Sequence, residues 1–258
     1  MILSSSGDVA FYIGNFPVYK YGILMAVAVG LAVFLCEKIS KNLPKDFFYD
    51  NFIYLIIFGF LGARLYYCAL SFSYYSKHFA EIFNFREGGL SIHGAIIAGL
   101  ITAVILSKKN KIPVLKLSDC LACVLPLSQA IGRWGNFFNS EAFGLPTYSS
   151  WGVFIPIDKR PFMFKEYEFF HPTFLYESLF DLLIFAVLYL MYKKNLQDGV
   201  ITFTYLILYS VVRFLIEAVR IDSALDIIGI PVAQIISLFF IFTGIIGLAW
   251  VLTICKND

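Results

Sequence analysis

Residues 231–255 read PVAQIISLFFIFTGIIGLAWVLTIC and carry no charged side chain. About 20 apolar residues in a helix span the roughly 30 Å hydrocarbon core of a bilayer, so this stretch predicts a transmembrane helix. Six further stretches have the same character, at residues 19–36, 47–70, 93–107, 118–138, 172–192 and 199–218. The third is short and its ends are poorly marked. The sequence therefore predicts an all-α integral membrane protein with seven transmembrane helices.

The composition agrees with this fold class, since 59% of the 258 residues are apolar, 18% are aromatic and the mean hydropathy is +0.77. We expect residues 1–258 to form a single polytopic membrane domain. Residues 1–14 contain no Lys or Arg, no long apolar core and no Ala-x-Ala site, so a cleaved signal peptide is not expected. Asp119 directly follows Ser118 at the start of an expected span, a position that favours a helix N-cap.

The five cysteines predict no structural disulfide, because their number is odd and most lie inside apolar stretches. Cys120 and Cys123 form a C-x-x-C pair, but no histidine or second pair accompanies it, which disfavours a metal or redox site. The other three are Cys36, Cys68 and Cys255.

The lysines predict the orientation of the chain. They gather in alternate connections and in the C-terminal tail, at Lys38, Lys41, Lys45, Lys108, Lys109, Lys111, Lys116, Lys193, Lys194 and Lys256. The positive-inside rule places these segments in the cytoplasm, so the N-terminus is expected outside and the C-terminus inside.

The arginines are distributed differently, because all of them fall in the outer half: Arg64, Arg86, Arg133, Arg160, Arg213 and Arg220. A guanidinium offers a rigid fork of donors that matches the oxygens of a phosphate, whereas lysine is a hydrated point charge. The simpler interpretation is that an arginine anchors the protein at the membrane interface, and we favour it for Arg86 and Arg160.

Several polar residues share one predicted depth. At about 1.5 Å per residue, Arg64 lies roughly 25 Å and Arg213 roughly 20 Å from the cytoplasmic ends of their helices. Tyr21 and His93 begin helices at the outer face, and Glu177 lies about 9 Å inside another. Five or six helices therefore deliver ionisable groups to one layer open to the outer leaflet.

One helix face carries four of the candidate residues, because Tyr209, Arg213, Glu217 and Arg220 are spaced i, i+4, i+8 and i+11. Two arginines that share one glutamate leave a positive charge uncompensated, and a phosphate site requires such a charge. The alternative is a purely structural Arg–Glu pair that holds helices together.

His93 follows a glycine-rich turn at residues 88–92 and opens a helix, whose amides and dipole favour an anion nearby. The alternative is a histidine that only caps its helix.

Residues 132–144 read GRWGNFFNSEAFG and place Arg133, Asn136, Asn139 and Glu141 at the outer edge of an otherwise apolar chain. A cation in a low-dielectric setting needs an anion, and beside a bilayer the abundant anion is a lipid phosphate. This run indicates chemistry on a phospholipid.

The pattern G-R-x-G-N-F-x-N-x-E-x-x-G in this run resembles the signature of the prolipoprotein diacylglyceryl transferase family. The resemblance extends across almost the whole chain, in the family's order, through YG at 21–22, GAR at 62–64, GGLSIHG at 88–94, HPTFLYE at 171–177 and the helix face at 209–220. Residues 145–170 match only in general character.

The resemblance implies transfer of the diacylglyceryl group of phosphatidylglycerol to the lipobox cysteine thiol of a preprolipoprotein, with release of glycerol phosphate. This is the first step of bacterial lipoprotein maturation, in the cytoplasmic (inner) membrane with the active site toward the outer leaflet. The implied catalytic residues are His93, Arg133, Arg213, Tyr21 and Glu217. The implied phosphatidylglycerol-binding residues are Arg133, Asn136, Asn139, Glu141, Gly144, Tyr209, Arg213, Arg220 and Arg64. No metal, organic cofactor or nucleic-acid partner is expected, since the nucleophile arrives with the peptide and the leaving group with the lipid.

Residues 145–170 interleave aromatic and basic side chains, among them Trp151, Phe162, Lys159 and Arg160. Aromatic rings at headgroup level and cations toward anionic lipid predict an extracytoplasmic interfacial cap, which serves as an anchor or as a gate for substrates.

The main alternative function is a seven-helix anion or lipid transporter, or flippase. Transporters usually contain an internal repeat and hold polar groups near the midplane, and we find neither in this sequence. The sequence lacks the G-x-S-x-G motif, which disfavours an intramembrane protease. A function as a sensory receptor does not explain the arginine layer.

Overall fold

The computed structural model describes residues 3–4, 7–40, 43–85, 88–221, 226–227 and 229–254. Arg86, Lys41, Cys255 and Lys256, whose roles are predicted above, lie outside the described residues.

Among the described residues, seven helices are long and apolar enough to cross a membrane, as expected for a multi-pass membrane protein. They are α1 (Lys20–Ile39), α2 (Phe47–Leu70), α4 (Ile92–Lys109), α5 (Val114–Asn139), α6 (Thr173–Tyr192), α7 (Val200–Glu217) and α8 (Val232–Ile254). The short third span is confirmed as a full helix of 18 residues. The fourth begins at Val114, earlier than the expected residue 118, because apolar Val114 and Leu115 extend the helix ahead of the polar Ser118.

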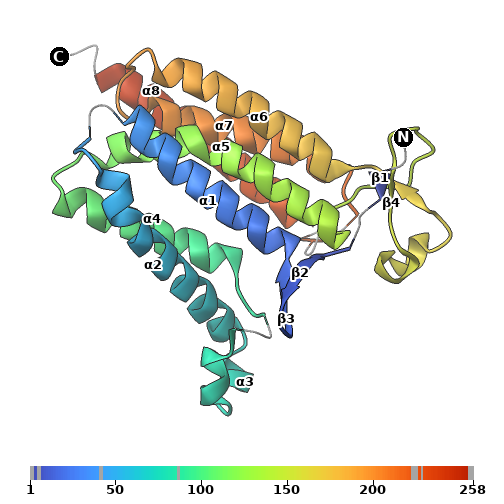
Figure 1. Cartoon of the computed structure of the whole chain (residues 1–258). Coiled ribbons are helices and arrows are strands. Elements are labelled where there is room, and N and C mark those ends of the chain that lie inside the picture. The colour runs from blue at the N-terminus through green and yellow to red at the C-terminus, as the bar shows by residue number, and fades with distance from the viewer. Residues whose placement is uncertain are drawn as a thin grey trace. The chain divides into compact units, whose positions relative to one another are not determined.

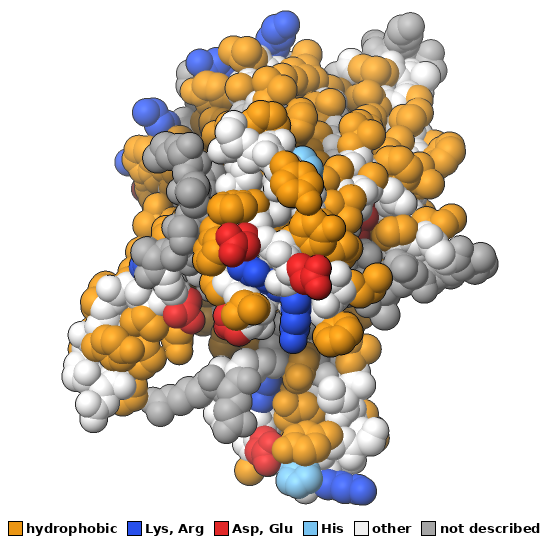
Figure 2. Space-filling model, turned by 90° about the vertical axis from the view of Figure 1, so that its right-hand side faces the viewer, with side chains coloured by type: hydrophobic (Ala, Val, Ile, Leu, Met, Phe, Trp, Pro, Cys, Tyr) orange, Lys and Arg blue, Asp and Glu red, His pale blue; other side chains and the backbone are white. Residues whose placement is uncertain are grey.

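Apolar side chains remain exposed along all of these helices, including Leu65, Leu100, Leu215 and Phe239, which are each about three-fifths accessible. Figure 2 looks at the right-hand side of the view in Figure 1, and there too apolar side chains are more abundant than charged ones, which form small groups. Since water does not solvate such a surface favourably, the exposed apolar side chains are those expected to face lipid.

The chain divides into two compact units, Met1–Leu35 with Asp119–Asp258, and Cys36–Ser118. We call them the first and the second unit. The single domain expected for residues 1–258 stays a prediction.

In the first unit, α5, α6, α7 and α8 run alongside one another and alongside α1 (Figure 1). Small residues allow close helix approach, since a Cβ at Gly244 of α8 would lie 3.0 Å from the carbonyl oxygen of Phe203 in α7. Ser178 Oγ of α6 donates to the carbonyl of Ala130 in α5 at 3.0 Å.

Asp119 is buried inside α5 and does not cap its own helix, which corrects the N-cap prediction. Its carboxylate accepts hydrogen bonds from the backbone N–H groups of Gly199 and Thr202, each at 2.7 Å, so it caps α7 instead. Only the first turn of a helix has N–H groups without a partner in the helix. Asp119 lies inside α5, beyond its first turn, so the N–H groups that it accepts from are those at the start of α7.

Several connections of the first unit form small sheets. The antiparallel hairpin β2 (Val9–Ile13) and β3 (Phe16–Tyr19) precedes α1. A three-stranded sheet joins β1 (Leu3–Ser4), β4 (Val153–Phe154) and β5 (Phe169–Phe170), and β6 (Asp226–Ile227) pairs with β7 (Ile230–Pro231).

The predicted cap at 145–170 folds around β4, β5 and two short 3-10 helices, η3 (Ile157–Lys159) and η4 (Phe162–Phe164). Phe143, Val153, Ile155, Phe170 and Phe174 form a buried apolar cluster that joins this segment to the start of α6. Its role as an interfacial cap stays a prediction.

In the second unit, α2 packs along α4, and the short α3 (Phe72–Tyr75) and η1 (Phe79–Phe83) follow α2. Gly62 and Gly94 face each other across the two helices: a Cβ at Gly62 would lie 2.7 Å from the carbonyl oxygen of Gly94. Only glycine permits this approach, which fixes the N-terminal end of α4 against the C-terminal half of α2.

Candidate functional site

Ion pairs join α5, α6 and α7 of the first unit where α5 ends, α6 begins and α7 ends. The spacing along each helix explains why the side chains meet, because residues four apart share a helix face. Glu177 and Asp181 are so related on α6, as are Arg213 and Glu217 on α7. We call the following residues the arginine network: Arg133, Glu177, Asp181, Arg213, Glu217 and Arg220.

Glu177 is the centre of the arginine network. Its Oε2 lies 2.5 Å from Arg133 Nη2, and its Oε1 accepts hydrogen bonds from Arg220 Nη1 at 3.0 Å and Arg213 Nη1 at 3.3 Å. One carboxylate on α6 therefore binds guanidinium groups from α5, from α7 and from the residue three positions beyond Glu217.

Glu217 lies beside two arginines. Arg213 is on the predicted helix face, whereas Arg220 follows the end of α7, which corrects the prediction that this face includes it. Its Oε2 is 2.5 Å from Arg213 Nη2 and 3.9 Å from Arg220 Nε. Asp181 completes the set, with its Oδ2 4.0 Å from Arg133 Nε.

Among the described residues of the arginine network, the expected surplus of positive charge is not observed, because that expectation counted Glu217 as the only counterion. Three arginines face Glu177, Glu217 and Asp181, so three positive charges meet three negative ones when all are ionised. The rotation of α6 turns both of its acidic residues toward the arginines. The spacing of residues along α7 alone does not reveal these two negative charges.

Exposure separates the cations of the arginine network from its anions. The side chains of Arg133 and Arg213 are 21% and 20% exposed, whereas those of Glu177 and Glu217 are 4% and 2% exposed. The carboxylates lie behind the guanidinium groups and hold them. An anion that arrives from the accessible side therefore meets N–H donors whose positions are already set.

Tyr209 of α7 and Tyr21 of α1 flank α5. The hydroxyl of Tyr209 accepts a hydrogen bond from Arg133 Nη2 at 3.5 Å, and its ring stacks on Tyr205. The ring of Tyr21 packs directly on Gly135, where a Cβ on residue 135 would overlap it. Both tyrosines are thus held against the helix that carries Arg133.

Polar residues in the run that follows Arg133 form hydrogen bonds with one another, and Glu141 is their common acceptor. The side-chain amides of Asn136 and Asn139 donate to Glu141 Oε1 at 2.9 and 3.2 Å. Ser140 and Ala142 adopt positive φ values of 53° and 55°, which turn the chain sharply after α5. Each asparagine keeps a second N–H, and the three polar residues fix one another.

Gly144 pairs with Arg220 in an isolated antiparallel bridge. A Cβ at residue 144 would lie 2.8 Å from the carbonyl oxygen of Val219 and 2.9 Å from Thr173 Cγ2, so only glycine fits. Gly144 thus lets the end of the signature run lie against the backbone that carries Arg220.

The other two predicted site residues, Arg64 and His93, belong to the second unit. His93 is the second residue of α4 and is exposed, with its ring centroid 6.2 Å from that of Tyr66. Arg64 is buried, and backbone carbonyls occupy its guanidinium. The layer that these two residues were expected to share with the arginine network stays a prediction.

Sequence reasoning missed Asp181 and the central position of Glu177. The signal available was an E-x-x-x-D pair on an apolar helix, since two carboxylates on one face of a membrane helix need cationic partners.

Arg160, interpreted as an interfacial anchor, donates to the carbonyls of Ile155 and Lys165 and so stabilises residues 155–165.

Comparison with known proteins identifies the family. Residues 8–250 match the family model described as prolipoprotein diacylglyceryl transferase. A relative from Synechocystis sp., named phosphatidylglycerol–prolipoprotein diacylglyceryl transferase, is 40% identical over 98% of this chain and 92% of its own length. Relatives with the same name from Trichormus variabilis and Thermotoga maritima are both 42% identical, over 96% and 92% of this chain and 91% and 82% of their own lengths. With a match over nearly its full length and relatives at this level of identity, the chain belongs to the prolipoprotein diacylglyceryl transferase family.

Proposed function

We propose that this protein transfers the diacylglyceryl group of phosphatidylglycerol to the lipobox cysteine thiol of preprolipoproteins and releases glycerol phosphate. The observation that carries the proposal is the arginine network, whose accessible guanidinium groups are held from behind by buried carboxylates. The relatives are named for this reaction, and their names do not support the transporter alternative.

In the proposed reaction, the cysteine sulfur attacks the glycerol carbon that carries the phosphate. A carbon–sulfur bond forms, the carbon–oxygen bond breaks with its electron pair going to the phosphate oxygen, and the thiol proton passes to a base. The leaving phosphate monoester carries more negative charge than the phosphodiester from which it came. Arg133, Arg213 and Arg220 stabilise that increase.

The remaining site residues have positioning roles in this proposal. Tyr21 and Tyr209 orient the headgroup hydroxyls, and Glu217 fixes Arg213 and Arg220. Asn136 and Asn139 use one N–H each to hold Glu141 and can offer the other to the lipid. The lipid supplies the leaving group and the peptide supplies the nucleophile, so the reaction needs no cofactor.

One assay tests the function directly. The purified protein is mixed with phosphatidylglycerol and a synthetic lipobox peptide, and mass spectrometry detects the diacylglyceryl thioether. A peptide with serine in place of the cysteine is the control. Absence of the thioether with the cysteine peptide refutes the proposal.

His93 is the proposed general base, because a thiol with a pKa of about 8.5 is mostly protonated at neutral pH. A general base acts only in its unprotonated form, so the pH–rate profile of the transfer is expected to have a rising limb. His93→Gln is expected to remove this limb while lipid still binds, whereas His78→Gln, at another exposed histidine, retains it. The measurement is the pH–rate profile at saturating phosphatidylglycerol. An active His93→Gln protein with an unchanged limb would show that another group accepts the proton.

We further propose that the protein lies in the bacterial cytoplasmic membrane with its lysine-rich connections inside and the site toward the outer leaflet. Lys109, Lys194 and Lys159 are exposed positions that test this orientation. In a background without the native cysteines, Lys109→Cys and Lys194→Cys are expected to resist an impermeant thiol reagent in intact cells, and Lys159→Cys to react. Permeabilised cells, in which all three react, are the control. Labelling at position 109 in intact cells contradicts the orientation.

A further inference from the structure

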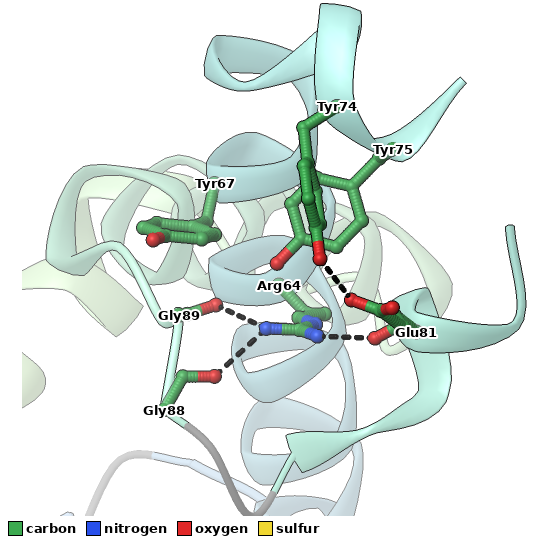
Figure 3. A pocket seen from close by; sticks show the side chains of 7 residues that line it. All are labelled: Arg64, Tyr67, Tyr74, Tyr75, Glu81, Gly88 and Gly89. Carbon is green, nitrogen blue, oxygen red and sulfur yellow. Dashed lines mark hydrogen bonds between the residues drawn. The ribbon is translucent and has the colours of Figure 1, made fainter. Parts of the chain in front are cut away.

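Arg64 is a buried cation whose hydrogen bonds are all made to the backbone of its own unit. It is 3% exposed, and a pocket of about 200 Å³ lies beside it, lined by tyrosine rings (Figure 3). A guanidinium has five N–H donors. The carbonyl oxygens that accept from Arg64 belong to Glu81, Ile82, Asn84, Gly88 and Gly89, at 2.6 to 3.0 Å.

This saturation bears on the role of Arg64, because a donor that is bonded to a carbonyl is not available to a phosphate. The three arginines of the arginine network are bound by carboxylates, which an incoming anion resembles. Arg64 is bound by neutral carbonyls within residues 81–89, and its guanidinium also faces the rings of Tyr75 and Phe85 at 5.4 and 5.7 Å. Its hydrogen bonds therefore hold together the backbone of η1 and the described residues that follow it toward α4.

Gly88 and Gly89 show how tightly that connection fits. Both have positive φ values, 84° and 76°. A Cβ at Gly88 would meet nothing within 4 Å, whereas a Cβ at Gly89 would overlap Arg64 Nη1 and lie 2.7 Å from Tyr67 Cε1. The two glycines are alike in backbone strain and differ in their contact with Arg64.

The connection ends at Ser91, two residues before His93, which is the second residue of α4. The N–H of Ser91 donates to the carbonyl of Ala63 at 3.0 Å, next to Arg64 in the chain. Gly94 packs on Gly62. Residues 62–64 of α2 thus contact both sides of His93. Arg64 and Ala63 hold residues that precede it, and Gly62 packs on the residue that follows it.

We infer that Arg64 is a positioning residue, which fixes the backbone at residues 81, 82, 84, 88 and 89 and thereby the place of His93 at the start of α4, and that it is not a phosphate ligand. The inference rests on the proposed function, with His93 as the base. It assigns to Arg64 an effect on the chemical step and none on lipid binding.

The test compares Gly89→Ala with its matched control Gly88→Ala, using kcat and KM for phosphatidylglycerol with a lipobox peptide. Misplacing a catalytic group by about 1 Å costs on the order of 100-fold, so Gly89→Ala is expected to lower kcat at neutral pH by about 30- to 100-fold relative to Gly88→Ala. Its KM for phosphatidylglycerol is expected to stay within a few-fold of the parent. The loss shrinks as the pH rises above about 8.5, where the thiol ionises without a base.

Arg64→Lys is the second variant, because lysine offers three donors where the backbone presents five acceptors. The same loss in kcat, with KM retained, is expected for the fraction that folds, as judged by thermal unfolding in detergent. A rise in KM without a fall in kcat overturns the inference and identifies Arg64 as a lipid ligand. Equal activities of Gly89→Ala and Gly88→Ala, or a loss that does not depend on pH, also overturn it. A parent protein that forms no thioether refutes the proposed function, and the inference with it.

Discussion

Arg133→Lys is expected to lower the transfer rate by about 30- to 1000-fold, although it keeps the positive charge, because losing one oriented donor to a developing anion costs on the order of 2–4 kcal/mol. Arg133 uses Nη2 toward Glu177 and Tyr209, and Nε toward Asp181. A single ammonium cannot contact these partners and a phosphate with the same planar geometry. The measurement is kcat/KM for phosphatidylglycerol, with thermal unfolding in detergent as a check of folding.

The matched control is Arg160→Lys, since Arg160 also donates through Nε and Nη1 but to backbone carbonyls outside the arginine network. We expect its activity to stay within a few-fold of the parent. If Arg133→Lys behaves like Arg160→Lys, Arg133 is a structural residue and the phosphate binds elsewhere.

Glu177→Gln is expected to destabilise the folded protein strongly, more than Arg133→Lys does. Removing the charge of one partner from a buried ion pair costs about 3–5 kcal/mol, because the remaining charge stays buried without compensation. Glu177 contacts three guanidinium groups, and two carboxylates of the arginine network, those of Glu217 and Asp181, remain beside them. We therefore expect a lower unfolding temperature and a large loss of transfer.

An added anion distinguishes this cause from a packing defect. Glycerol phosphate that binds among the three arginines, which then face two carboxylates of the arginine network instead of three, stabilises the variant by mass action, and is expected to raise its unfolding temperature more than that of the parent. Glu168→Gln changes an exposed carboxylate and serves as the control, with the parent's stability and activity. A Glu177→Gln protein that unfolds and transfers like the parent would mean that Glu177 does not hold the arginines.

These two predictions describe the two layers of one site. Buried carboxylates compensate the arginines, and the side chains of Arg133 and Arg213 remain partly exposed. A lipid phosphate can then share the arginines without the protein having to rearrange, which is the condition for strong electrostatic stabilisation of the leaving group.

The sequence by itself determined the seven spanning helices, because length and apolar composition decide whether a helix crosses a bilayer and neither depends on other parts of the chain. It also determined that Arg213 and Glu217 share a face, since their spacing is a property of one helix, whereas Arg220 lies beyond the end of α7. The signature at 132–144 was sufficient to indicate the family.

The tertiary structure alone decided which partners these residues have. Glu177 lies 36 residues before Arg213 and 43 before Arg220, and only the rotation of α6 against α5 and α7 turns it and Asp181 toward the arginines. Asp119 likewise caps a helix 80 residues away, and Arg64, expected to face a phosphate, binds the carbonyls of a connection that starts 17 residues later. A residue's spacing limits which face it occupies, but the helix packed on that face decides what it binds.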